Sequence, residues 1–167
     1  MLRLLLLRHA EAGWPHGVDD IDRPLSPQGM RDARRVGAYV ADQDLVPDLA
    51  LVSPARRTRE TWRLVGGSWE SPPEHLVDDD IYAASTRGLL QVVRERGGDA
   101  SSLVLVGHSP AVPDLLATLA APDQRRWVPL HYPPAALAVV DLAIERWADA
   151  APGLGTVERV VTRRDDD

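Results

Sequence analysis

Two arginines and two histidines in this sequence have chemistry that fits together: Arg8, His9, Arg57 and His108. A guanidinium presents a planar fork of N–H donors that matches phosphate oxygens, and it keeps its charge at any working pH. A neutral imidazole can attack phosphorus as a nucleophile. If these four side chains meet, the chemistry they can perform is the binding and transfer of a phosphoryl group.

The first two of these residues stand directly after Leu2–Leu7, a run that is apolar except for Arg3. A run of this length and purity is typical of a strand buried on both faces of a parallel sheet. Ligands of open α/β sheets bind at the carboxyl ends of such strands. We therefore predict that Arg8 and His9 lie at the ligand-binding edge of a sheet.

Two further apolar runs, Leu49–Val52 and Leu103–Val106, are also predicted to be buried strands. Arg57 follows the first run after a short connection, and His108 follows the second run almost at once. Parallel strands end at the same edge of their sheet, so we expect all four side chains to converge there.

Helical segments alternate with the strands, which predicts βαβ crossovers and a sheet covered on both faces. We expect helices at 27–41, after Ser53-Pro54, at 86–96 and at 110–120, with Ser26, Ser53 and Ser109 as N-caps. Further strands are expected at 76–77, 135–142 and 156–162, the last one at an edge, and a frayed acidic tail at 165–167. The predicted fold is a three-layer α/β/α sandwich with a mainly parallel sheet, one antiparallel edge strand and a single domain over 1–167.

Composition narrows the class of protein. The chain has 167 residues, 44% of them apolar, a formal net charge of -6 and no cysteine. We expect no nucleic-acid partner, because no basic face can easily dominate such a surface, and the missing thiols exclude thiolate metal sites and thiol nucleophiles. The apolar start is interrupted before it reaches the length of a signal peptide, and no segment is long enough to span a membrane. These features predict a cytoplasmic protein without a membrane partner.

Four segments, in this order, resemble the histidine phosphatase superfamily, which also contains the cofactor-dependent phosphoglycerate mutases. They are Arg8-His9-Ala10-Glu11, with alanine where the family has glycine, Leu25-Ser26 with Gly29 and Ala33, Ser53-Pro54 with Arg57 and Thr61, and Gly107-His108. The short middle region resembles that of the small SixA-type protein-histidine phosphatases.

The resemblance implies a set of roles. His9 would be the nucleophile, and Arg8, Arg57 and His108 would bind the phosphoryl oxygens without a metal or other cofactor. Asp80 stands at the position most like the family's general acid, although its acidic neighbours in Asp78-Asp79-Asp80 leave an exposed loop end as an alternative.

Two features predict the class of substrate: how open the predicted site is, and what the leaving group of the reaction needs. Between Thr61 and Leu103 the sequence provides one helix and loops, too little for a lid. An open site suits a phosphorylated side chain on another protein, and an imidazole leaving group tolerates a poorly defined acid better than an alkoxide does. We expect a phosphohistidine protein as substrate, with a small-molecule phosphomonoester or a mutase reaction as the alternative within the superfamily.

Several residues keep open roles. Ser53 is interpreted as a helix cap rather than a phosphate ligand. Glu11 could orient an arginine or face solvent, and His16 could overhang the site or simply be exposed.

Two rival classes remain. The segment Gly107-His108-Ser109-Pro110-Ala111 approaches a serine hydrolase's nucleophile elbow but lacks its last glycine, and Asp123 and His131 would have to complete the triad. A phosphate-binding protein without catalytic activity is the other rival.

Overall fold

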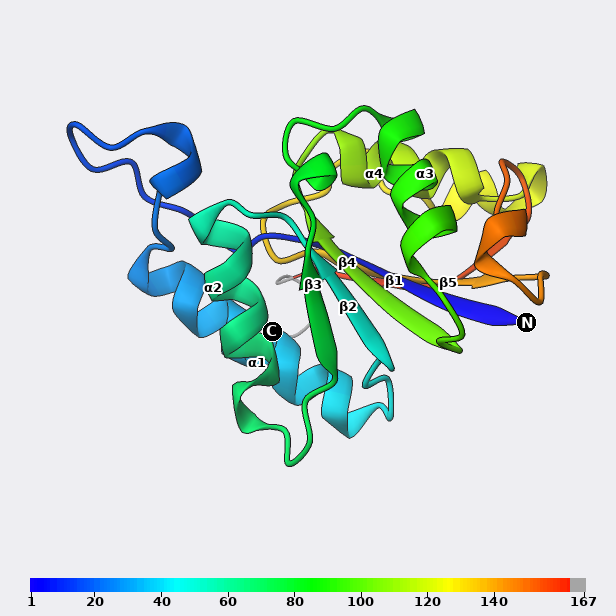
Figure 1. Ribbon diagram of the computed structural model, residues 1–167, viewed down its shortest axis with the longest axis horizontal. Coiled ribbons are helices and arrows are strands. Elements are labelled where there is room, and N and C mark those ends of the chain that lie inside the picture. The colour runs from blue at the N-terminus through cyan, green and yellow to red at the C-terminus, as the bar shows by residue number, and fades with distance from the viewer. Residues whose placement is uncertain (163–167) are drawn as a thin grey trace.

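A six-stranded sheet forms the centre of the protein, shown in Figure 1 as a computed structural model in which residues 1–162 are described. The predicted acidic tail at 165–167 lies outside the described residues. In spatial order the strands are β3 (Glu74–Val77), β2 (Leu49–Val52), β4 (Ser102–Gly107), β1 (Leu2–Arg8), β5 (Leu137–Leu142) and β6 (Gly155–Val161).

The first four strands along the chain are parallel to one another, whereas β5 is antiparallel to both β1 and β6. The mainly parallel sheet is therefore confirmed. The reversed strand lies one position in from the edge, because β6 adds a further strand beyond β5, rather than at the edge itself.

Helices cover both faces of the sheet, which confirms the α/β/α class (Figure 1). Helices α1 (Pro27–Asp42) and α2 (Arg56–Val65) lie on one face, and α3 (Thr86–Arg96) and α4 (Ala111–Leu119) lie on the other. Short 3₁₀ turns connect these elements, among them η1 (Asp20–Asp22), η3 (Asp79–Ile81) and η4 (Pro122–Trp127).

Strand β1 divides its side chains between the two layers. Leu4 and Leu6 pack among residues of α3 and α4, and Leu5 and Leu7 pack among residues of α1 and α2. All four are at most 1% exposed. The continuous apolar run at the start of the chain is thus explained by burial on both faces.

The three predicted serine caps have different outcomes. Ser26 is the N-cap of α1, and its hydroxyl accepts a hydrogen bond from the Gly29 amide at 3.0 Å. The predictions for Ser53 and Ser109 are wrong, because α2 and α4 begin after Ala55 and Pro110, with no capping side chain. The Ser53 hydroxyl instead hydrogen-bonds to His108, which directly follows β4.

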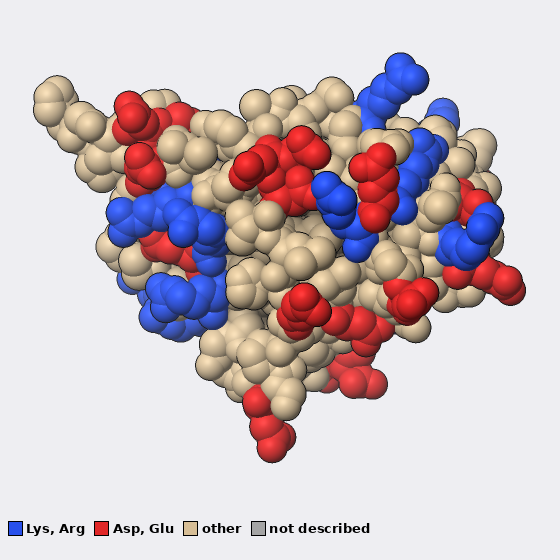
Figure 2. All heavy atoms as spheres, in the orientation of Figure 1, with Lys and Arg blue, Asp and Glu red and all other residues tan. Residues whose placement is uncertain are grey.

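Charges of both signs share the face shown in Figure 2. Basic side chains gather over α2, which exposes Arg56, Arg59 and Arg63, and acidic side chains gather near the end of β3, which is followed by exposed Asp79 and Asp80. Among the described residues, no helix has the length and apolarity that crossing a membrane requires.

Candidate active site

The sheet order brings three strand ends together. Strands β2, β4 and β1 are consecutive neighbours, and Arg8 pairs in register with Gly107. The amide of His9 donates to the Gly107 carbonyl at 3.0 Å, and the amide of Ser53 donates to the Val106 carbonyl at 3.1 Å. The backbone hydrogen bonds of the sheet therefore continue one residue past β1 and one residue past β2. They fix the backbone from which the side chains of the site project.

The His9 imidazole is held in one tautomer. Its Nδ1 lies 2.7 Å from the carbonyl oxygen of Ala10, which can only accept, so Nδ1 carries the proton and Nε2 carries the lone pair. The residue is 8% exposed. Burial first, and then the positive charge of Arg57 and Arg8 and the neighbouring His108, lower the pKa of His9 to about 3 against the opposing effect of the Ala10 hydrogen bond. The His9 imidazole is therefore neutral at neutral pH.

The backbone after His9 is fastened to two helices. The Ala10 amide donates to Oγ1 of buried Thr61 on α2 at 3.0 Å. On the other side, α1 approaches so closely that a Cβ built on Gly29 would lie 2.0 Å from the Glu11 carbonyl oxygen. These contacts explain why Gly29 and Thr61 belong to the sequence motifs: they allow α1 and α2 to hold the backbone that follows His9.

Arg57 projects from the first turn of α2 toward His108. We call Arg8, His9, Arg57 and His108 the cluster. The Arg57 side chain is 8% exposed, and its Nη2 lies 3.3 Å from Nδ1 of His108. The Nε atoms of both Arg57 and Arg8 are buried and have no hydrogen-bond partner among the described residues. Buried donors without partners are rare in proteins, so the two guanidinium groups stand out from the rest of the described side chains.

His108 faces His9 across the site. The two ring centroids lie 5.4 Å apart with planes inclined by 56°. Because the Arg57 guanidinium can only donate, Nδ1 of His108 accepts, and Nε2–H donates to the Ser53 hydroxyl at 2.7 Å. Burial and the charge of Arg57 lower the pKa of His108 to about 4, although Asp20 acts in the opposite direction.

Asp20 and Tyr82 complete the cluster, and sequence reasoning missed both. Asp20 accepts hydrogen bonds from Arg57 through its backbone carbonyl at 2.7 Å and its carboxylate at 3.2 Å, and Tyr82 donates to the same carboxylate at 2.6 Å. The Tyr82 hydrogen bond, with further contributions from Arg57 and Arg23, lowers the pKa of Asp20 to about 2. No pattern in the sequence marks Asp20, because it stands in a loop far from Arg57 along the chain.

Other candidate residues lie outside this cluster. Asp80 is exposed on η3, and no contact in the described part of the chain joins its side chain to His9, Arg57 or His108, so its role as general acid stays a prediction. Glu11 accepts a hydrogen bond from the Ser26 hydroxyl at 2.8 Å, and it forms no ion pair with an arginine of residues 1–162. His16 is exposed in its loop.

The residues of the rival serine site do not assemble. Among residues 1–162, no hydrogen bond joins Ser109 to His131 or His131 to Asp123, and all three are exposed. The described residues also contain no group of three or more His, Asp or Glu side chains placed to hold a metal ion.

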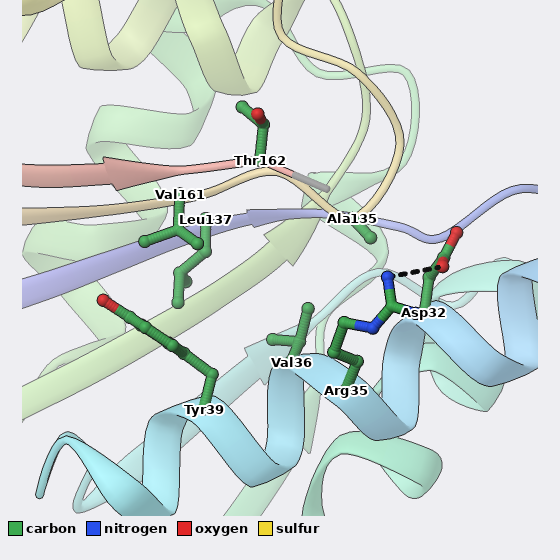
Figure 3. A pocket seen from close by; sticks show the side chains of 8 residues that line it. All are labelled: Asp32, Arg35, Val36, Tyr39, Ala135, Leu137, Val161 and Thr162. Carbon is green, nitrogen blue, oxygen red and sulfur yellow. Dashed lines mark ion pairs between the residues drawn. The ribbon is translucent and has the colours of Figure 1, made fainter. Parts of the chain in front are cut away.

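A small cavity lies apart from the site, between α1 and strands β5 and β6 (Figure 3). Its volume is about 20 Å³, and its lining includes Val36, Tyr39 and Leu137 together with the Arg35–Asp32 ion pair. A space of this size suits about a single water molecule rather than a substrate.

Comparisons with known proteins show which family this fold belongs to. The family model of the histidine phosphatase superfamily (branch 1) matches residues 4–81. An uncharacterized protein of Mycobacterium tuberculosis is 30% identical over 152 residues, which cover 88% of this chain and 93% of that protein. The phosphohistidine phosphatase SixA of Escherichia coli is 26% identical over 122 residues, 71% of this chain and 74% of that protein.

Solved structures show the same fold. A protein assigned as SixA phosphohistidine phosphatase from Nakamurella multipartitia superposes with a TM-score of 0.83 at 29% identity, covering 96% of this chain and 95% of that one. The protein histidine phosphatase SixA complexed with tungstate gives a TM-score of 0.79 at 23% identity and covers 99% and 100% of the two chains. The chain belongs to the histidine phosphatase superfamily, and the resemblance seen in its motifs is confirmed.

Proposed function

We propose that this protein is a phosphatase that hydrolyses phosphohistidine in another protein, with His9 as the nucleophile and a phosphohistidine enzyme intermediate. The observation that carries the proposal is the state of His9: its Nδ1–H is held by the Ala10 carbonyl, which leaves the Nε2 lone pair free near the charged guanidinium groups of Arg57 and Arg8. A neutral imidazole in such surroundings is ready to attack phosphorus.

The first step transfers the phosphoryl group to His9. Its Nε2 forms a bond to phosphorus while the bond from phosphorus to the substrate's imidazole nitrogen breaks, and that imidazole leaves with the electron pair and takes up a proton. Arg8 and Arg57 would bind the phosphoryl oxygens through the N–H donors of their guanidinium groups. Charge that spreads over these oxygens in the transition state is stabilised by such preorganised donors.

The second step hydrolyses the intermediate. Water attacks phosphorus, the bond to Nε2 of His9 breaks with its electron pair returning to the imidazole, and inorganic phosphate leaves. The attacking water loses one proton to solvent, which balances the proton that the substrate's imidazole takes from solvent in the first step. His108 would assist by contact with the phosphoryl oxygens, because a bound anion in place of the Arg57 contact favours a proton on its Nδ1.

The leaving group supports the phosphohistidine substrate over an ordinary phosphoester. Among the described residues, Asp20 is the one carboxylate that hydrogen-bonds to a member of the cluster, and its pKa of about 2 keeps it ionised at neutral pH. An alkoxide needs a proton donor to leave, whereas a protonated imidazole leaves readily. A cluster without a protonated carboxyl group therefore fits a P–N bond better than a P–O bond.

The test compares substrates and variants. The wild-type protein, His9→Ala and the matched control His75→Ala, at an exposed position of β3, are assayed on a phosphorylated histidine phosphotransfer domain, free phosphohistidine, phosphosugars and p-nitrophenyl phosphate. Phosphohistidine should be the fastest substrate, and labelled phosphate should be trapped on wild type and His75→Ala but not on His9→Ala. Retained activity in His9→Ala would refute the nucleophile. Faster turnover of a small phosphomonoester would assign the alternative activity of the superfamily.

A further inference from the structure

A groove of about 470 Å³ opens beside the phosphate site, between the first turns of α4 and the loop 128–132. We call it the α4 groove. Its lining includes the phosphate-site arginine Arg8, and also Pro113, Asp114, Ala117, Leu130 and Tyr132. A substrate whose phosphoryl group is bound at Arg8 therefore has a ready-made channel for the atoms that carry that group.

Arg8 belongs both to the predicted phosphate site and to the lining of the α4 groove. Its Nη1 donates to the Tyr132 carbonyl at 2.9 Å, in the wall of the groove, while its Nε is buried without a protein partner. On the opposite side, the Arg57 guanidinium is covered by Asp20, and Tyr82 lies edge-on to the His108 ring at 5.7 Å between centroids. The α4 groove reaches the site through Arg8, which is part of its lining.

The lip of the groove is unusually apolar for exposed surface. Leu130 has a relative exposure of 109%, and Trp127, which ends η4 just before the groove loop, is 57% exposed. Proline and alanine side chains continue this apolar surface into the groove at Pro129 and Ala117. Apolar surface gathered next to a catalytic centre is typical of a site that contacts another protein.

The lining of the α4 groove includes one carboxylate. Asp114 is the acidic residue of its lining, it is exposed, and its side chain takes part in no ion pair within residues 1–162. Arg8 also lines the groove, but it is the group that would bind the phosphoryl oxygens, so Asp114 is the charged side chain left for the rest of a bound segment and favours a positive charge there.

We propose that the α4 groove docks the polypeptide next to the phosphorylated histidine of the substrate, and that it selects an apolar side chain and a basic side chain there. The proposal rests on the proposed function, because it requires a phosphohistidine at Arg8 and His9. Its occupant is a segment of the substrate protein, with an apolar residue against Leu130 and Ala117 and a basic residue facing Asp114.

The test uses synthetic phosphohistidine peptides. One peptide carries leucine and arginine beside the phosphohistidine, a second carries serine and glutamate at the same places, and free phosphohistidine is the third substrate. The kcat/KM of the leucine-arginine peptide should exceed that of the other two about tenfold. Leu130→Ser should lower it roughly three- to tenfold without changing the rate on free phosphohistidine.

Two further variants sharpen the result. Asp114→Arg should reverse the charge preference, so that a leucine-glutamate peptide becomes better than the leucine-arginine peptide. Leu76→Ser, at an exposed leucine of the edge strand β3, is the matched control and should leave every ratio unchanged.

The two proposals fail in different ways. If the peptides and free phosphohistidine share one kcat/KM, or if Leu130→Ser lowers all rates equally, the docking proposal is overturned and the proposed function stands. If the protein hydrolyses p-nitrophenyl phosphate but no phosphohistidine at all, the proposed function is overturned, and the docking proposal falls with it.

Discussion

Asp20 lies directly on Arg57: its carboxylate accepts from Nη2 at 3.2 Å, and its carbonyl accepts from Nη1 at 2.7 Å. The carboxylate therefore offsets part of the positive charge that would bind a phosphoryl group, and it occupies a donor that an anion could use. Tyr82 donates to the same carboxylate and holds it in place.

Asp20→Asn should tighten anion binding. The substitution keeps the backbone carbonyl on Arg57 but removes the competing negative charge, so the inhibition constant for inorganic phosphate should fall roughly three- to tenfold. Tyr82→Phe is the control, because it removes a hydrogen bond and leaves the charge. A weaker inhibition by phosphate in Asp20→Asn would mean that the carboxylate mainly positions Arg57.

Ser53→Ala should loosen His108. The Ser53 hydroxyl is fully buried and accepts from Nε2–H of His108 at 2.7 Å, so its loss leaves that donor without a partner. Loss of one such hydrogen bond should lower kcat/KM about tenfold. Nitrogen-15 NMR of the imidazoles provides the specific readout: His108 should be protonated at Nε2 in wild type and a mixture of tautomers in the variant. An unchanged tautomer would contradict this role.

Gly29→Ala should destabilise the protein and impair the site together. The added Cβ would lie 2.0 Å from the Glu11 carbonyl oxygen, so α1 and the segment after His9 must move apart, at a cost of about 1–3 kcal/mol. Gly67→Ala is the matched control, because nothing lies within 4 Å of its Cβ position. Denaturant unfolding and the kcat of both variants give the measurement, and equal stabilities would show that the close approach relaxes freely.

The buried histidines should make stability fall in mild acid. The pKa of His9 is about 3 in the folded protein, below the ordinary 6.5, so unfolding takes up a proton. The stability that this difference provides is complete above about pH 6.5 and is lost progressively below it. At pH 4.5 the loss from His9 should amount to about 2–3 kcal/mol.

His9→Gln isolates this contribution. The wild-type free energy of unfolding should fall relative to that of the variant by about 2 kcal/mol or more between pH 7 and pH 4.5. Urea unfolding at a series of pH values measures the difference. A difference that does not change with pH would show that His9 is not held neutral by its surroundings.

Local sequence patterns were enough to predict most of the elements and the set of side chains that meet at the sheet edge. The apolar run of β1, the Ser26 cap and the alternation of strands and helices depend on local patterns, and each is found in the structure. The convergence of His9, Arg57 and His108 also followed from the sequence, because parallel strands must end at one edge. The resemblance of the motifs added the family.

The contacts between segments distant along the chain depend on tertiary packing, and the sequence did not predict them. Asp20 is 37 positions from Arg57 and 62 positions from Tyr82 in the sequence, and Ser53 is 55 positions from His108. No local pattern therefore predicts these hydrogen bonds. Ser53 is the clearest case: its local sequence is that of a helix cap, yet the neighbouring strand end offers its hydroxyl an imidazole. Local propensity sets which elements form, whereas the choice of a polar side chain's partner depends on what packing brings within hydrogen-bonding distance.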